Sequence, residues 1–190
     1  MSTHSAENNM VSWWMVKHPQ WEDLRFPASA VNPPGGASGP ALNTTNGTYL
    51  FDATGTELVF GLAQMPHSWA EGSAIKPHVH WMKTTSAAGN VFWQLDYKMC
   101  PIGEILDSEF TTLSSSTSSI PDTNTAGKHL VTEFGIIDMT GKTSSDMIIL
   151  KLSRIGGNAA DTYAADAEFL EFDLHYQVDS LGSANEFSNT

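Results

Sequence analysis

The sequence predicts an all-β protein, an antiparallel jelly-roll-like β-sandwich with an extended N-terminal arm. In the central part of the chain, apolar and polar residues alternate with a period of two, the pattern of half-buried strands. Segments rich in turn-forming residues separate these runs. No segment carries a sustained helical stripe. Seven or eight short strands at this spacing are typical of sandwiches and jelly rolls.

The chain divides into three zones by composition. Residues 1–50 form an N-terminal arm and a Pro/Gly-rich segment, because VNPPGGASGP at 31–40 cannot be regular structure. Residues 51–179 are expected to form the β-sandwich domain. Residues 180–190 are a polar C-terminal tail that we expect to fray.

The strands follow from the alternation, taken in order. Clear alternation marks the segments 57–65, 75–83, 90–100, 146–154 and 168–178. Weaker strands are expected at 105–113 and 129–138, and loops at 85–90, 111–128, 139–145 and 154–166. In the last strand the pattern places Leu170 inside and Phe169 outside. The predicted core includes Leu58, Phe60, Val79, Trp81, Trp93, Leu95, Ile148, Leu150, Phe172, Leu174 and Tyr176.

Composition and charge exclude several classes of protein. Hydrophobic residues make up 41% of the chain, enough for a core. A formal charge of −12 with nine Lys plus Arg would repel a phosphate backbone, so we expect no nucleic-acid partner. The longest apolar runs are far short of the roughly 20 residues that cross a bilayer, so we expect no membrane partner. Cys100 is the single cysteine and the first ten residues resemble no secretory signal, so we expect folding in a reducing cytosol.

Two histidines on one predicted strand raise the question of a metal site. Gly72, His78 and His80 reproduce the opening of the first cupin motif, and imidazoles at i and i+2 of a strand can share one ion. The glutamate that the cupin pattern requires next is absent from residues 81–86, and so is the second motif. Histidines lining a barrel would also force Val79 and Trp81 into water, at about 1.5–3 kcal/mol each. A cupin-like metalloenzyme is therefore the least favoured interpretation.

A second group of polar residues lies on the polar face of the last predicted strand. Glu171, Asp173 and His175 lie opposite its apolar face. If the two strands are neighbours, these residues and the histidine pair could contact an ion or lie around an oligomer axis. The plainer interpretation, a hydrogen-bonded polar face, is favoured. We predict no metal, no cofactor and no catalytic residue.

Other motifs carry little chemistry. Gly141 and Lys142 suggest a phosphate-binding loop, but that motif requires a glycine five positions before Gly141, where this chain has Ile136.

The aromatic N-terminus is more informative. It either packs on its own domain or forms an arm that anchors a partner through Trp13, Trp14 and Trp21.

Four segments together resemble a known family. They are WEDLRFPASAV, QMPHSWAEGSAIKPHVHW, NVFWQLDYKMCPIGE and ADTYAADAEFLEFDLHYQVDSLGS, within about residues 20–183. They are similar to small β-sandwich proteins encoded among the virion structural genes of tailed phages, and PHVHW and EFDLHYQVDSLGS are the most specific parts. The resemblance implies a structural component of the virion without catalysis.

The expected role is that of a capsid decoration (cement) protein. It would be a homotrimer that binds the major capsid protein on the capsid exterior, after assembly in the host cytoplasm, and it would stabilise the shell. The alternative is a tail- or fibre-associated module that binds a receptor or carbohydrate. Deletion of residues 1–20 is expected to weaken attachment more than folding.

Overall fold

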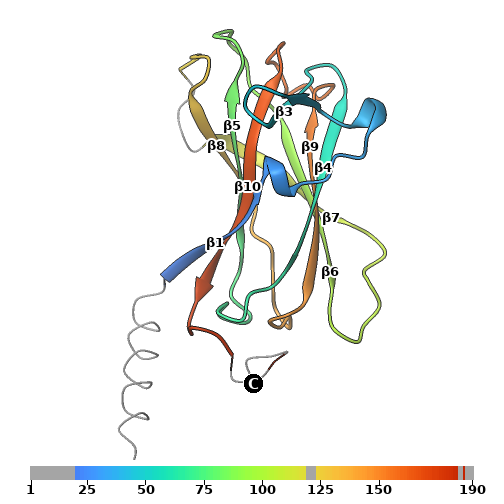
Figure 1. Ribbon diagram of the computed structural model, residues 1–190, viewed down its shortest axis with the longest axis vertical. Helices are drawn as coiled ribbons and strands as arrows, with labels where there is room; N and C mark the ends of the chain where they lie inside the picture. Colours follow the sequence, from blue (N-terminus) through green and yellow to red (C-terminus); the bar gives the residue numbers. More distant parts are fainter. Residues whose placement is uncertain (1–19, 119–122, 184–185, 187–190) are drawn as a thin grey trace, which may run out of the picture.

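Two antiparallel sheets face each other across one core, as the computed structural model of the protein shows (Figure 1). The structure describes residues 20–118, 123–183 and 186, so Trp13 and Trp14 lie outside the described residues. Ten strands carry the fold: β1 (Gln20–Pro27), β2 (Ala41–Asn43), β3 (Thr48–Phe51), β4 (Thr56–Gln64), β5 (Lys76–Lys83), β6 (Trp93–Cys100), β7 (Thr111–Ser118), β8 (His129–Phe134), β9 (Met147–Ile155) and β10 (Ala167–Val178). The 3-10 turns are η1 (Ala28–Ala30) and η2 (Gly36–Ser38). None of the helical segments in the described ranges is long and apolar enough to cross a membrane.

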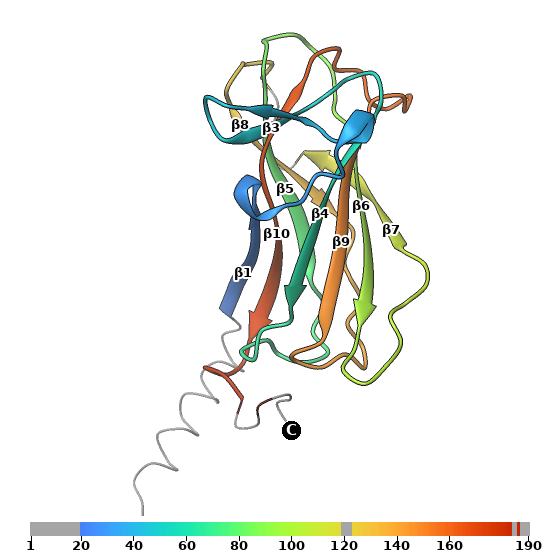
Figure 2. The same cartoon turned by 45° about the vertical axis from the view of Figure 1, so that its right-hand side comes forward.

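The strand order is that of a jelly roll. Sheet A runs β2-β3-β10-β5-β8, with β1 paired along β10. Sheet B runs β4-β9-β6-β7, and β4, β9 and β6 lie side by side in Figure 2. From β3 to β10, successive strands lie in opposite sheets except for the neighbours β6 and β7, which gives the nested order of two Greek keys. The predicted antiparallel jelly-roll-like sandwich is confirmed.

Strand β7 joins the two sheets at one edge. Its first half, Thr111 to Ser114, pairs with β6 in sheet B, and Ser115 and Ser118 pair with β8 in sheet A. The expectation of a strand at 105–113 and a loop at 111–128 is therefore wrong in both boundaries. The Ser/Thr-rich composition hides the strand, because its partners on both sides impose the extended conformation that its own side chains do not signal.

Most of the predicted core is buried, because the expected alternation of side chains holds on β5, β6, β9 and the second half of β10. The buried members are Val79, Trp81, Trp93, Leu95, Ile148, Leu150, Phe172, Leu174 and Tyr176. Aromatic rings fill the centre: Phe51 meets Trp93 edge-on with ring centroids 5.1 Å apart, and Trp81 meets Trp93 at 6.1 Å. Such edge-on pairs add to the stabilisation that burial provides.

Strand β4 has the opposite parity to the one predicted. Val59 is fully buried, whereas Leu58 and Phe60 are only partly buried and Leu62 is exposed. The reason lies at Gly61, where an added Cβ would come within 2.6 Å of Cζ of Phe172. The small residues of β4 face the core because large aromatic rings on sheet A already occupy that space.

A bulge in β10 corrects a second prediction. The pairing of β10 with β5 shifts register between Phe169 and Glu171. Phe169 is consequently buried and Leu170 only partly buried, the reverse of the expectation. The extra residue changes which alternate positions face the core, so Ala167 and Phe169 before it and Phe172, Leu174 and Tyr176 after it all point inward.

The N-terminal boundary also differs from the prediction. Strands β1, β2 and β3 lie before residue 52 and belong to sheet A, so the sandwich includes most of the segment expected to be an arm. Phe26 of β1 stacks on Phe172 of β10, with ring centroids 4.6 Å apart. The rest of the expected arm, residues 1–19, lies outside the described residues.

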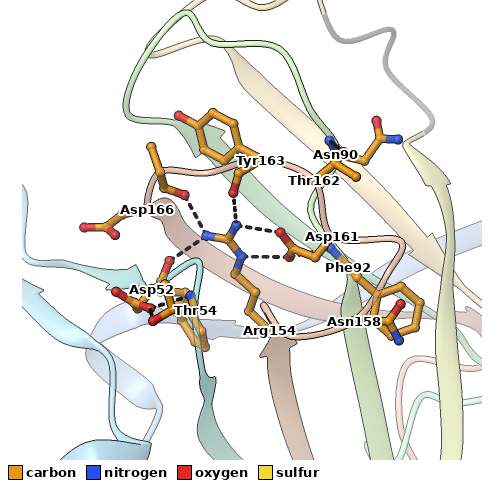
Figure 3. Close-up of polar contacts among 12 residues, drawn as sticks. Asp52, Thr54, Asn90, Phe92, Arg154, Asn158, Asp161, Thr162, Tyr163 and Asp166 are labelled. Atoms are coloured by element: carbon orange, nitrogen blue, oxygen red, sulfur yellow. Dashed lines mark hydrogen bonds and ion pairs between the residues drawn. The ribbon is translucent and has the colours of Figure 1, made fainter.

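A buried arginine fastens the loop between β9 and β10 (Figure 3). Both carboxylate oxygens of Asp161 accept hydrogen bonds from Arg154, at 2.9 and 2.8 Å. The remaining donors of the guanidinium reach the carbonyl oxygens of Phe51, Tyr163 and Ala165. All five donors of Arg154 are thus paired within the protein, and this buried charge is structural.

Candidate functional site

The outer face of sheet A carries a lattice of charged and imidazole side chains. Asp173 of β10 lies opposite Arg25 of β1 on one side and His78 of β5 on the other. His78 in turn lies opposite Glu133 of β8. Neighbouring strands therefore place these four residues in one row across the sheet, as the pleat of an antiparallel sheet requires.

Two further rows flank the first. Toward the start of β1, His175 of β10 lies between Asp23 and Lys76. In the other direction, Glu171 of β10 lies opposite His80 of β5. The sequence analysis brought the two polar groups together only if their strands are neighbours, and β5 and β10 are paired. His78, His80, Glu171, Asp173 and His175 lie on one face.

This face points away from the core. Val79 and Trp81, which alternate with the histidines, are buried between the sheets. The side chains of His78 and Asp173 are nevertheless only 9% and 4% exposed, because neighbouring side chains surround them. They form the floor of an open pocket of about 660 Å³, lined by Asp23, Arg25, Lys76, Pro77, His78, His80, Val131, Glu133, Phe134, Ile136, Glu171, Asp173 and His175.

Asp173 is the centre of the pocket floor. Its Oδ1 lies 2.7 Å from Nε2 of His78, and its Oδ2 lies 3.3 Å from Nε2 of His80. Neither Oδ1 of Asp173 nor Nε2 of His80 makes a hydrogen bond of acceptable angle, although both atoms are buried. The contacts are therefore close approaches of a ring nitrogen to a carboxylate oxygen that lack the alignment of a hydrogen bond.

The pKa values of this pair move in opposite directions. Burial opposes ionisation of Asp173, but the imidazoles of His78 and His80 outweigh burial and lower the pKa of its carboxyl to about 2. Burial likewise disfavours the charged form of His78, but the carboxylate of Asp173 outweighs it and raises the pKa of His78 above its ordinary value. Both shifts favour the charged pair.

Further ion pairs surround the floor. Oδ1 of Asp23 lies 2.7 Å from Nε2 of His175. Arg25 donates from Nε and Nη2 to one oxygen of Glu171, at 3.0 and 2.5 Å. Strand β1 thus holds one imidazole and one carboxylate of β10 in place.

The arrangement has the chemistry of a cation site. One ligand atom from each of His78, Asp173 and His175 lies within 4.8 Å of the others, and the same holds for His80, Glu171 and Asp173. Imidazole nitrogens and carboxylate oxygens are the usual protein ligands of first-row divalent metals. The cupin geometry differs, because cupin histidines line the inside of the barrel and these face outward.

Strand β1 supplies the residues that sequence reasoning missed. Asp23 and Arg25 line the pocket, and neither is among the site residues expected from the sequence. The signal was present, because Trp21, Asp23 and Arg25 alternate with Leu24 and Phe26 as on a strand. Only Phe26 among these five is buried in the core.

Trp21 is the one residue of the predicted tryptophan anchor that the structure describes. It is 44% exposed, on the same outer face as the pocket, and Nζ of Lys76 lies 4.8 Å from the centroid of its ring. The tryptophan therefore borders the pocket next to the row of His175 and Lys76.

One end of the sandwich, here called the lower end, collects exposed apolar side chains. It consists of the start of β1, loops 65–75, 101–110 and 135–146, and residues 179–183, at the bottom of Figure 1. The large apolar side chains exposed there are Trp21, Ile102, Ile105, Leu106, Ile136 and Leu181. Two others in the described ranges, Leu42 and Leu62, lie on β2 and within β4. A concentration of exposed apolar residues marks an interaction surface more often than scattered ones do.

Comparisons with known proteins give little about function. No protein-family model matches the chain, and no curated protein matches it. One similar solved structure is that of the Clostridium thermocellum endo-1,4-beta-D-xylanase 10B, with its CBM22-1 and GH10 modules complexed with xylohexaose. That match covers 87% of this chain and 29% of the other, at 10% identity and a TM-score of 0.36. The chain thus spans less than a third of that chain's length, and a likeness of this degree carries no argument about ligand or activity.

Proposed function

We propose that the chain is a structural protein of a tailed-phage virion, a decoration protein that binds the outside of the capsid shell. The observation that carries the proposal is the lower end of the sandwich. Ile105 is 92% exposed and Leu181 is 90% exposed, and both lie at the end where β1 begins. Whatever precedes Gln20, including Trp13 and Trp14, enters the domain there.

A capsid surface is a fitting partner for such an end. Exposed apolar side chains and tryptophan supply the kind of anchors that dominate protein interfaces. The acidic charge of −12 gives the rest of the domain a solvated surface that disfavours aggregation. The resemblance of about residues 20–183 to virion proteins supplies the choice of a phage particle as the partner. On a repeating lattice, a homotrimer would bind by several weak contacts at once.

The test uses purified particles of the phage that encodes the chain. Quantitative mass spectrometry should find the chain in fixed proportion to the major capsid protein. Recombinant chain should rebind particles from which it has been removed. A chain absent from capsids, or present at only a few copies at the tail, would overturn the proposal in favour of the tail- or fibre-associated alternative.

A pair of variants tests the lower end directly. The double substitution Ile105→Asp with Leu181→Asp places charge on two exposed apolar positions, so rebinding to particles should fall while folding is retained. Leu42→Asp is the matched control, since Leu42 is 55% exposed but lies on β2, away from the lower end. If both proteins rebind equally well, the lower end is not part of the surface that attaches to the capsid.

The carbohydrate-binding alternative has its own readout. Glycan-binding modules stack sugars on exposed aromatic rings, and among the described residues Trp21 is the tryptophan with substantial exposure. Its ring already contacts Lys76. Saturable binding on a glycan array that is lost in Trp21→Ala would favour the alternative over capsid decoration.

A further inference from the structure

We propose that His78, Asp173 and His175 bind one divalent transition-metal ion on the outer face of sheet A. The three ligand atoms come from adjacent strands β5 and β10 and lie within 4.8 Å of one another. Small rotations of the side chains bring them onto one ion at the distances of about 2.0–2.2 Å that zinc sites show.

A second observation points to a ligand at the same place. Asp173 is 3% exposed, and its Oδ1 makes no hydrogen bond even though Nε2 of His78 is 2.7 Å away. Buried carboxylate oxygens are normally satisfied by hydrogen bonds, because an unsatisfied one costs free energy. A nitrogen and an oxygen at this distance that are not aligned for a hydrogen bond are placed to serve as two ligands of a shared cation.

The local charge also favours a cation. The pocket is lined by four carboxylates, Asp23, Glu133, Glu171 and Asp173, against two permanent cations, Arg25 and Lys76. With neutral imidazoles the lining carries a net charge of −2. A dication would compensate that charge in a site where the central carboxylate is shielded from water.

Two groups of possible ligands share Asp173, one with His78 and His175 and the other with His80 and Glu171. The other contacts of these residues decide which group binds the ion. Glu171 belongs to the other candidate group, but its carboxylate is already paired with Arg25. His175 instead has a partner that supports metal binding. Asp23 contacts its Nε2 at 2.7 Å, the carboxylate–imidazole arrangement that fixes the tautomer and orientation of a metal-binding ring.

The ligand set selects the class of ion. Two imidazoles and one carboxylate suit zinc and other first-row transition metals. Magnesium and calcium prefer oxygen ligands in larger number. The open pocket above the three residues leaves space for a water molecule or a partner's side chain at the fourth position. An ion held there would clamp β10 to β5.

The experiment measures metal bound to the untagged full-length chain, since a histidine tag would itself bind zinc. The chain is dialysed against zinc chloride and then against metal-free buffer, and bound zinc is counted by mass spectrometry. We expect one zinc per chain, no retention of calcium or magnesium, and a higher unfolding temperature with zinc. Retention of less than one zinc in every two chains would overturn the proposal, as would preferential calcium binding.

Variants locate the ion. His175→Ala and Asp173→Asn should abolish zinc retention, and Asp23→Asn should weaken affinity about 10–100-fold through the orientation of His175. His67→Ala is the matched control, because His67 bonds Ser145 away from this pocket. Zinc retention unchanged in His175→Ala, or lost equally in His67→Ala, would place the ion elsewhere.

A spectroscopic measurement keeps the test independent of folding in the variants. Cobalt(II) added to the unaltered chain should give visible absorption typical of a site with nitrogen and oxygen ligands, and zinc should displace it. Absence of such a spectrum at equimolar cobalt would contradict the site. Circular dichroism without metal reports separately whether Asp173→Asn folds. Metal content and capsid binding are separate readouts, so either proposal can fail alone.

Discussion

Asp173 of β10 and His78 of β5 are paired residues of adjacent antiparallel strands, and their side chains meet on the outer face of sheet A with Oδ1 2.7 Å from Nε2. The register of the two strands is what brings them together. A slip of one residue would turn the histidine toward the core and Val79 toward solvent, at a cost in buried apolar area. Core packing on one face therefore determines the polar cluster on the other.

The buried guanidinium of Arg154 should contribute strongly to stability. Arg154→Met leaves the carboxylate of Asp161, whose side chain is 1% exposed, buried without its cation. We expect the free energy of unfolding to fall by about 3–5 kcal/mol, measured by urea denaturation. Arg25→Met is the control, since Arg25 is exposed and solvent screens its ion pair with Glu171, so its loss should change stability little. Equal losses in the two variants would contradict a special role for Arg154.

Gly61 should tolerate no side chain. The Cβ of Gly61→Ala would lie 2.6 Å from Cζ of Phe172 and 2.8 Å from Cδ1 of Phe26, so the stacked rings must shift. We expect a loss of about 1–3 kcal/mol in the free energy of unfolding, the usual cost of overpacking. Gly55→Ala serves as the comparison, because an added Cβ there has no atom within 4 Å. A Gly61→Ala protein as stable as Gly55→Ala would mean that the aromatic pair is loosely packed.

Asp96 should make the protein sensitive to acid. Burial disfavours the charged form of this carboxyl, but hydrogen bonds from Thr112, Lys151 and Gln94 outweigh burial and lower its pKa. A lowered pKa stabilises the fold above the unfolded value of about 3.9, and that stability is lost as the pH falls through the lower folded value.

The matched variants for this effect are Asp96→Asn and Glu109→Gln. At neutral pH, Asp96→Asn should be less stable than the unaltered chain by about 1–3 kcal/mol. Below about pH 4 the difference should shrink, because the unaltered carboxyl is then being protonated. Glu109 is exposed, so its substitution should shift the curve little. Denaturant unfolding from neutral to acid pH measures both, and a difference that is constant with pH would refute the assignment.

The segment before β1 should matter for attachment more than for folding. Deletion of residues 1–19 leaves β1 intact, since β1 begins at Gln20 and its pairing with β10 starts there. We expect an unchanged unfolding midpoint and reduced rebinding to phage particles. Trp13→Ser with Trp14→Ser in the full chain should reproduce the loss. Full occupancy of particles by the deleted protein would show that these residues do not bind the capsid.

Side-chain alternation made much of this protein predictable. On β5 and the second half of β10 it separated Val79, Trp81 and Phe172 from the histidines and carboxylates, and the structure places them on opposite faces. The same rule misled on β4, where Val59 and Gly61 face the core. Parity within a strand is a local property, but the choice between its two faces depends on the volume available in the core.

What the sequence determined by itself was the fold class and the face on which each polar group of β5 and β10 lies, because backbone geometry imposes a period of two on every strand. Only the tertiary structure decided that β10 lies between β1 and β5, that a bulge between Phe169 and Glu171 changes which side chains face the core, and that β7 runs from Thr111 to Ser118. Strand neighbours and register result from packing summed over the whole core. For that reason the contact between Asp173 and His78 exists only in the folded chain.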